Sequence, residues 1–262
     1  MKISSLIEIV AALHLTFYVN SNSPERGGLM LRGHPASLKT AVVSVLNEFP
    51  NAMLVSDLTV KQAAPLREHM ISGKIVTLAF SELAKLYQRN SAGGANIEGF
   101  IQGIVAEGFL HMNWERQELS VRPARALVIG CMTNYLYQEH FSDWLDRGFA
   151  RRFLWSHIAL FDGGAVMEAL MENRRLQFIE RFSFKVPLQR NGIQYNVNRE
   201  EAKELKHLIR FQPGQEMPFT LLAKTLSALK WKNPTKPERP MEIIRDFAES
   251  LTKEGAELHL KE

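Results

Sequence analysis

The stretch LMLRGHPASLKTAVVSVL combines a glycine, a lysine and a threonine in the spacing of a phosphate-binding loop. Gly33, Lys39 and Thr40 match the pattern G-x-x-x-x-G-K-[ST], in which backbone amides and the lysine hold phosphate oxygens and the hydroxyl contacts Mg²⁺. Leu38 stands where the pattern has its second glycine. An ordinary strand, loop and helix, with Ser37 as the helix cap, would leave a similar pattern. The loop therefore predicts nucleotide binding only together with the rest of the chain.

A second candidate follows the apolar run IVTLAF, where Ser81 and Glu82 stand in place of an Asp-Glu pair. In nucleotide-hydrolysing sites the first carboxylate orients Mg²⁺ and the glutamate polarises the attacking water. Ser81 brings a hydroxyl without a negative charge. We therefore expect weaker Mg²⁺ binding or slower hydrolysis, unless Asp57 supplies the missing carboxylate. The alternative interpretation is a helix N-cap at Ser81 with an acid in the first turn.

These residues need a scaffold that brings them together. Apolar runs without polar alternation predict strands at 29–32, 51–57, 74–80, 125–132 and 152–160. Helical patterns between them cover 39–48, 60–71, 81–89, 97–109 and 137–148, with a loop at 91–96. Such an alternation is typical of a parallel sheet covered on both faces. Ligands then bind at the carboxyl ends of the strands, where Gly33–Thr40, Ser81-Glu82 and Thr133-Asn134 all fall.

The pattern changes after about residue 162, and we divide the chain there. Residues 1–28 are expected to form a soluble amphipathic helix and a linker, residues 29–162 the core, and residues 163–262 a mostly helical region. In that last region a hairpin is expected around Asn191-Gly192. Further helices are expected at 199–210, 218–230 and 240–253.

Composition restricts the remaining chemistry. The 262 residues are 45% hydrophobic and 23% charged, and the formal charge of +4 permits nucleic-acid binding without arguing for it. Cys131 is the single cysteine and lies in an apolar run, so we expect a buried, unreactive thiol and a reducing compartment. The eight histidines show no metal-ligand spacing. No stretch is suited to span a membrane, so we expect a cytoplasmic protein.

Taken in order, these motifs resemble the AAA+ family of P-loop ATPases over about residues 29–160. GHPASLKT stands at the first nucleotide motif and VTLAFSELAKL at the second. ALVIGCMTN resembles the sensor-1 strand, which implies that Asn134 contacts the γ-phosphate or the lytic water, with Thr133 as an alternative. The resemblance implies an α/β fold. That fold is a P-loop NTPase three-layer sandwich with a central, mainly parallel sheet and a small, mostly helical C-terminal region.

The segment DRGFARRF resembles the arginine-finger segment of the same family. The resemblance implies that Arg151 and Arg152 reach the ATP of a neighbouring subunit, with Arg147 as an alternative. A solvated basic turn would have the same composition. If the finger is real, the active form is a homo-oligomer, because each nucleotide site is completed by another copy of the chain.

Within the family, the chain is similar to the clade with a hairpin before sensor 1, which includes the minichromosome maintenance helicases. That clade also lacks the glycine before the loop lysine and carries alanine there, whereas this chain has the bulkier Leu38. The spacing from Glu82 to Lys85 also follows the clade's second motif. A predicted hairpin at 110–123 stands at the equivalent place, and the resemblance implies that Trp114 and Arg116 near its tip contact a polymer, with DNA preferred over protein.

The resemblance implies ATP and Mg²⁺ as cofactors. Mg²⁺ is expected at Thr40 and Ser81, and catalysis at Glu82 with Asn134, Arg151 and Arg152. The nucleotide is expected to contact Gly33, His34, Pro35, Ala36, Ser37, Leu38, Lys39 and Thr40. Two other functions remain open. One is a nucleotide-gated DNA-binding or loader protein with little hydrolysis, suggested by Ser81, and the other is a kinase.

The C-terminal region matches the family's lid by position, and a lid arginine usually serves as sensor 2. The candidates are Arg174, Arg175, Arg181 and Arg210. The stretch LKWKNPTKPERP joins lysines with Trp231, a composition suited to phosphate contact and base stacking, although a solvated linker has the same features.

Overall fold

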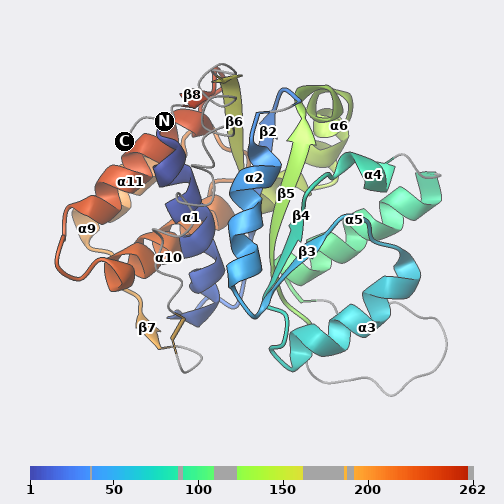
Figure 1. The fold of residues 1–262 in the computed structure, drawn as a ribbon, viewed down its shortest axis with the longest axis horizontal. Coiled ribbons are helices and arrows are strands. Elements are labelled where there is room, and N and C mark those ends of the chain that lie inside the picture. The colour runs from blue at the N-terminus through green and yellow to red at the C-terminus, as the bar shows by residue number, and fades with distance from the viewer. Residues whose placement is uncertain (36, 88–90, 109–122, 162–185, 188–191, 259–262) are drawn as a thin grey trace, which may run out of the picture.

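The protein has a mixed α/β fold built on a parallel sheet. The computed structural model describes residues 1–35, 37–87, 91–108, 123–161, 186–187 and 192–258. The sheet has six strands, all parallel, in the order β3-β4-β5-β2-β6-β8 (Figure 1). In this order they are Ala52–Val55, Thr77–Phe80, Leu127–Thr133, Gly28–Gly33, Phe153–Phe161 and Ala256–Leu258. The expected parallel sheet is confirmed, and each of the five predicted strands is present.

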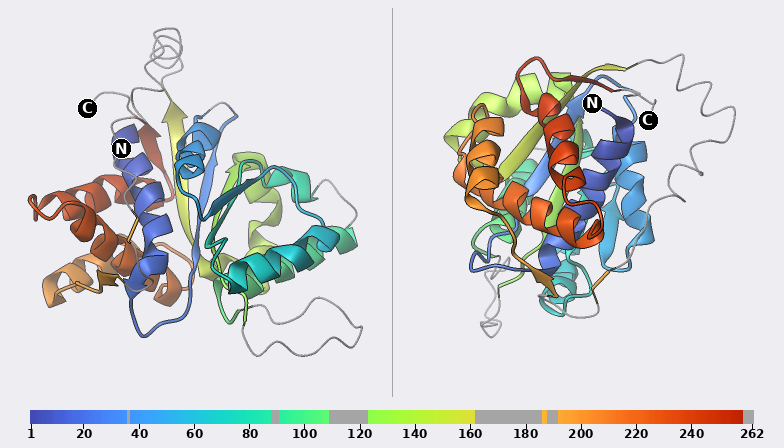
Figure 2. Two further views of the ribbon diagram at one scale, coloured as in Figure 1. Left: turned by 60° about the horizontal axis from the view of Figure 1, so that its bottom comes forward. Right: turned by 90° about the vertical axis from the view of Figure 1, so that its left-hand side faces the viewer.

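Helices cover both faces of this sheet (Figure 2). One apolar cluster, on what we name the first face, joins the sheet to α1 (Ile3–Leu15), α2 (Lys39–Val43) and the C-terminal helices. The C-terminal helices are α9 (Arg199–Leu208), α10 (Glu216–Lys232) and α11 (Arg239–Ala248). The other cluster, on the second face, contains side chains of α3 (Val60–Ile71), α4 (Ala84–Tyr87), α5 (Ser91–Val105) and α6 (Asn134–Asp146).

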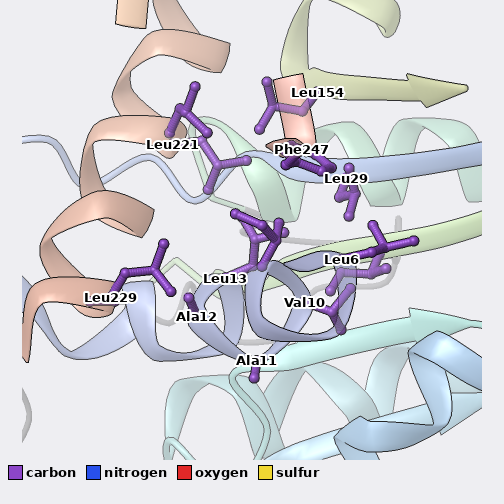
Figure 3. Packing of buried hydrophobic residues seen from close by; sticks show 14 of the residues in the cluster. Leu6, Val10, Ala11, Ala12, Leu13, Leu29, Leu154, Leu221, Leu229 and Phe247 are labelled. Carbon is purple, nitrogen blue, oxygen red and sulfur yellow. The ribbon is translucent and has the colours of Figure 1, made fainter. Parts of the chain in front are cut away.

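The N-terminal helix α1 is buried all round, so the amphipathic surface helix expected there is wrong. Ser4 is the only one of its thirteen residues that is not buried. In Figure 3, Leu6, Val10 and Leu13 lie among buried side chains from β2, β6, α10 and α11. Leu29, Leu154, Leu221, Leu229 and Phe247 are the labelled partners. The helix is thus an internal element of the first face.

Two polar residues of α1 are buried with partners on other elements. Glu8 is 5% exposed and pairs with Arg239 of α11 at 2.7 Å. His14 is fully buried, and its Nδ1 lies 3.0 Å from the hydroxyl of Thr77 at the start of β4. Burial lowers the pKa of His14 to about 3, so this ring is neutral in the folded protein. Although α1 is mostly apolar, two of its buried side chains therefore make specific polar contacts.

Neighbouring strands β2 and β5 send their following helices to opposite faces. After β2 the chain enters α2, whose Val42 and Val43 belong to the first-face cluster. After β5 it enters α6, whose Leu136 and Trp144 belong to the second-face cluster. A crevice for ligands is expected at the carboxyl ends where the connections diverge in this way. Here that place lies between Gly33 of β2 and its register partner at the end of β5.

The C-terminal region completes the edge of the sheet next to β6. The short strand β8 pairs in parallel with β6, and this sixth strand was not predicted. The buried amide of Gln212 accepts from the N–H of Trp155 at 2.7 Å and donates to its carbonyl at 3.1 Å. It also donates to Leu251 O at 2.9 Å. The side chain thereby substitutes for a neighbouring strand along β6.

The remaining predicted elements agree with the structure to different degrees. The helix expected at 60–71 has these limits, and the three late helices are present with shifted ends. The loop expected at 91–96 is wrong, because α5 begins at Ser91 despite Gly93 and Gly94. A second short parallel pair joins β1 (Val19–Asn20) to β7 (Ile193–Gln194). The turn at Asn191-Gly192 lies partly outside the described residues, and the domain limits stay predictions.

None of the helices described here combines the length and the apolar composition that crossing a bilayer requires.

Candidate functional site at the end of β2

The end of β2 can be occupied only by a residue without a side chain. A Cβ on Gly33 would lie 2.8 Å from Ile158 O on β6 and 2.8 Å from the hydroxyl of Ser37. Either contact is too short for a carbon atom. The glycine therefore lets the loop fold back against β6, which places Ser37 in the interior, with 3% of its surface exposed.

Lys39 is the first residue of α2, and its side chain lies across the loop that precedes it. Its ammonium group donates to the carbonyl oxygens of Gly33 at 3.2 Å and His34 at 2.6 Å, and to the hydroxyl of Ser37 at 2.7 Å. Lys39 is 8% exposed, and burial lowers its pKa, an effect that the neighbouring Cys131 partly offsets. The loop thus surrounds a buried cation with oxygen atoms alone.

Leu38, which replaces the second glycine of the motif, has a left-handed backbone. Its φ is 58° and its ψ is 5°, and it has the one positive φ among the described residues other than glycine. This conformation costs a residue with a Cβ about 1–2 kcal/mol and costs glycine much less. Leu38 therefore keeps the backbone shape that the missing glycine would favour, at the expense of strain beside Lys39.

The ends of β2, β4 and β5 are joined by hydrogen bonds. Thr40 at the start of α2 donates from its hydroxyl to Ser81 O, just past β4, at 3.2 Å. Two residues later, Leu83 N–H donates to Cys131 O of β5 at 2.8 Å. The structure therefore brings the two predicted nucleotide motifs together. Burial raises the pKa of the Cys131 thiol to about 12, in agreement with the expected unreactive cysteine.

Glu82, the expected catalytic carboxylate, lies at this edge with 52% of its side chain exposed. Its carboxylate forms an ion pair with Lys85, one helical turn on, at 3.4 Å. Asp57, the possible substitute for the missing aspartate, is exposed beyond the end of β3, the strand next to β4. Both carboxylates are thus on the expected edge of the sheet, and neither is buried in it.

The polar residues after β5 have two different environments. Thr133, the register partner of Gly33, caps α6 by accepting from Leu136 N–H at 3.2 Å. Asn134 follows it, and its Oδ1 is buried without a hydrogen-bond partner among the described residues. A buried acceptor without a partner costs about 1–3 kcal/mol, so its position needs an explanation. Of the two candidates, Thr133 is used in the fold and Asn134 is the one with a spare acceptor.

The arginines of the expected finger segment lie at the opposite end of the sheet. Arg151 and Arg152 directly precede β6, whose first residue pairs with the first residue of β2. The length of β2 puts them about 16 Å from the loop of the same chain. Arg152 donates to Gly148 O at 2.5 Å, and Arg147 pairs with Glu98 at 3.5 Å. Arg151 is exposed.

Several predicted site residues cannot be placed. Ala36 of the loop, Trp114 and Arg116 of the hairpin, and the possible lid arginines Arg174, Arg175 and Arg181 lie outside the described residues. Arg210 is described, and its guanidinium contacts His207 and the ring of Phe211 on the surface. His34 and Pro35 are exposed at the start of the loop.

The donors for Mg²⁺ can be tested against the chemistry of the site. Across the described residues, no group of three or more His, Cys, Asp or Glu side chains could enclose a metal ion. Mg²⁺ in phosphate sites typically takes one or two protein oxygens, and its remaining ligands are phosphate and water oxygens. The hydroxyls of Thr40 and Ser81 fit that requirement in type, although they bring no charge.

Sequence reasoning missed two functional candidates, Arg32 and His157. Both are polar residues inside otherwise apolar strands, in LMLRG and FLWSHIAL. They are register partners on β2 and β6. A basic residue within a mainly apolar strand was the available signal, and pairing Arg32 with His157 required knowing that β2 and β6 are neighbours.

Comparisons with known proteins identify no family for this chain. No protein-family model and no curated protein sequence matches it. Among solved structures, the chain is similar to the SCCmec type IV Cch active helicase, with 12% sequence identity and a TM-score of 0.49. The similarity covers 93% of this chain and 47% of the helicase chain, so this chain spans about half the length of that protein.

Proposed function

We propose that the crevice between β2 and β5 binds ATP and that the protein is an AAA+-like ATPase whose nucleotide cycle acts on DNA. The observation that carries the proposal is the position of Lys39 and Thr40. Lys39 lies over the end of β2 at the start of α2, and Thr40 reaches the end of β4. Both residues therefore lie at the carboxyl edge, beside the place where the helices after β2 and β5 diverge.

Binding of a triphosphate would replace the oxygen atoms that now surround Lys39. Phosphate oxygens carry negative charge, so hydrogen bonds to them are stronger than the present bonds to Gly33 O, His34 O and the Ser37 hydroxyl. The exchange also gives a buried cation a counter-charge, which the loop lacks. Charge therefore favours the nucleotide, while three existing hydrogen bonds and the strain at Leu38 limit its affinity.

Mg²⁺, when bound, neutralises charge on the phosphate oxygens. In this proposal Thr40 offers its hydroxyl to the ion and Ser81 contacts it through water. Glu82 would orient the attacking water, for which it has to leave its contact with Lys85. Asn134 would use its spare Oδ1 to hold that water or its side-chain amide to contact the terminal phosphate.

Assembly into a homo-oligomer is part of the proposal because the finger arginines cannot reach the loop of their own chain. If Arg151 of one copy completes the site of another, turnover per subunit rises with protein concentration, and Arg151→Ala removes this rise without changing ATP binding. A constant turnover per subunit in a preparation shown to be monomeric would contradict the assembly. DNA as the polymer rests on the resemblance of the hairpin at 110–123, and the +4 charge only permits it.

The direct test is an equilibrium titration of the protein with ATP and Mg²⁺. We expect one saturable site per chain and a rise of the melting temperature with ATP concentration, because a ligand that binds only the folded state stabilises it. Adding single-stranded DNA is expected to increase turnover. Absence of saturable binding at millimolar ATP would reject the function.

A second function, a nucleotide-gated binding protein with little hydrolysis, is favoured by the surroundings of Glu82. This carboxylate is half exposed and paired with Lys85, and Ser81 brings no negative charge to the metal. Turnover of Ser81→Asp against the wild type separates the two functions. A gain of tenfold or more, roughly 1.4 kcal/mol in the barrier, indicates a weakened ATPase. Normal wild-type turnover that Glu82→Gln abolishes would reject the gated protein.

A further inference from the structure

Two basic residues lie side by side on the second face of the sheet, directly before the candidate loop. Arg32 precedes Gly33 on β2, and His157 is its register partner on β6. Side chains alternate along a strand, and Met30 and Trp155, two residues earlier, belong to the second-face cluster. Neighbouring parallel strands are about 4.8 Å apart. Arg32 and His157 therefore project from the same face of the sheet, beside α6, whose Tyr137 contacts Arg32.

Arg32 is partly buried and has no acidic partner in the part of the chain that the structure describes. Its guanidinium stacks on the ring of Tyr137 from α6, 3.9 Å from the ring centroid. It donates a long hydrogen bond, 3.4 Å, to Lys253 O in the segment before β8. Burial lowers the pKa of Arg32. A partly buried cation without a carboxylate is unfavourable for stability alone.

The ring of His157 also lacks a hydrogen-bond partner on one side. Its Nδ1 lies 3.3 Å from the same carbonyl of Lys253, and its Nε2 is buried without a partner among the described residues. Gly255 packs on the ring so closely that a Cβ there would lie 2.6 Å from Nδ1. Burial, and then the charge of Arg32, lower the pKa of His157, and His34 of the loop adds a smaller effect of the same sign. Two basic groups, Arg32 and His157, thus lie together at this point.

We propose that Arg32 and His157 form a second oxyanion site, for a phosphate group, at the carboxyl edge beside the loop of Lys39. A guanidinium binds phosphate through two parallel hydrogen bonds, and its stacking on Tyr137 holds it in one orientation. His157 Nε2 supplies a further donor once the ring is protonated, because the Nδ1–H already faces Lys253 O. The sources of such a group are the terminal phosphate of a nucleotide and free inorganic phosphate. The nucleotide source rests on the proposed function, because it requires ATP in the neighbouring crevice.

The experiment follows the side-chain nitrogens of His157 by NMR in the ¹⁵N-labelled full chain, with His157→Gln to assign them. The probes are inorganic phosphate, ADP and ATP, each added separately. We expect inorganic phosphate to shift Nε2 and to raise the apparent pKa of His157, because an anion stabilises the protonated ring. A larger effect of ATP than of ADP at equal saturation assigns the site to the terminal phosphate. Equal effects assign it to free phosphate.

Arg32→Met tests the partner residue, and Arg199→Met, an exposed arginine on α9, is the matched control. We expect the phosphate dissociation constant to rise at least tenfold in Arg32→Met, to rise less in Arg32→Lys and to stay unchanged in Arg199→Met. A purely structural contact with Tyr137 predicts instead a lower melting temperature in Arg32→Met and unchanged phosphate binding. That result overturns the proposal, as does a His157 signal that responds only to an oligonucleotide.

The two proposals fail in different ways. If ATP does not bind, but inorganic phosphate still shifts His157 in the wild type and not in Arg32→Met, the nucleotide function is wrong and the oxyanion site stands. If ATP binds and His157 does not respond to any of the three phosphates, the oxyanion site is wrong and the nucleotide function stands.

Discussion

The two ends of β2 use glycine for different purposes. At the start, a Cβ on Gly28 would lie 2.3 Å from Val128 O and 2.6 Å from the ring of Phe153, so the glycine closes an apolar joint between three strands. At the end, Gly33 admits the Ser37 hydroxyl and the Lys39 ammonium group. The start of β2 is stabilised by apolar packing, whereas its end is stabilised by polar contacts that a ligand can replace.

Both ends of the sheet contain buried polar atoms without a hydrogen-bond partner among the described residues. Asn134 Oδ1 and His157 Nε2 are such atoms toward the carboxyl edge, and Arg125 Nε and Arg152 Nε are such atoms at the other end. The left-handed backbone of Leu38 has no counterpart at the other end, because it is the one positive φ among the described residues other than glycine. Backbone strain of this kind is typical of functional sites. The strain at Leu38, and not the number of unsatisfied atoms, therefore distinguishes the carboxyl edge.

The largest effect on stability is expected when Gly28 or Gly33 is replaced by alanine, and the two variants together test the difference between the ends of β2. Gly28→Ala should lower the free energy of unfolding by about 3 kcal/mol or more, because its Cβ meets backbone and a buried ring. Gly33→Ala should cost less stability, since its Cβ meets backbone at 2.8 Å rather than 2.3 Å and Ser37 can turn away, but it should weaken ATP binding more. Denaturant melts and ATP titrations of both variants measure this. Equal losses of stability with equal ATP affinity would remove the difference between the ends.

The next largest effect is a pH dependence of stability that comes from His14, which is buried among apolar residues next to Thr77 at the start of β4. Its folded pKa, about 3, lies below the ordinary value, so the unfolded chain takes up a proton first as the pH falls. The stability that His14 contributes is complete above about pH 6.5 and is lost progressively as the pH falls toward 3.

Between about pH 7 and pH 4 the wild type should therefore lose about 3 kcal/mol more stability than His14→Gln, whose amide does not titrate. Urea melts of both proteins at the two pH values give the difference. Parallel losses in the two proteins would mean that His14 is already accessible to protons in the folded state.

The smallest effect tests the strain at Leu38. Valine keeps more apolar surface than glycine, so burial alone predicts that Leu38→Val is more stable than Leu38→Gly. A positive φ reverses the order, because a β-branched residue is costly there and glycine is not. We expect Leu38→Gly to be the more stable by about 1 kcal/mol in thermal or urea unfolding. The opposite order would show that the loop is not left-handed at this residue.

Much of the scaffold could be predicted because it depends on local patterns. Continuous apolar runs gave the strands, and the capping box at Thr59 and Gln62 fixed the start of α3 at its predicted place. The character of α1 could not be predicted, because Glu8 and His14 resemble a polar face until their partners Arg239 and Thr77 are known. The start of α5 was missed for a similar reason, since two glycines locally favour a loop.

Some features of the candidate site could likewise be predicted from the sequence, and others could not. The meeting of the loop with Ser81 followed from strand order and motif position. Three facts could not be predicted. The closure of the loop on Lys39 and the positive φ of Leu38 depend on the exact path of the loop, and the pairing of Arg32 with His157 depends on the strand order. The roles assigned to Glu82, Arg151 and the hairpin remain predictions.

The most direct test of the central claim is the ATP affinity of Lys39→Ala compared with Lys74→Ala, which removes an exposed lysine at the other end of the sheet. Both variants should fold, as checked by thermal unfolding. We expect the dissociation constant for ATP and Mg²⁺ to rise at least a hundredfold in Lys39→Ala, roughly 2.7 kcal/mol, and to stay unchanged in Lys74→Ala. An unchanged affinity in a folded Lys39→Ala protein would contradict a nucleotide site at the end of β2.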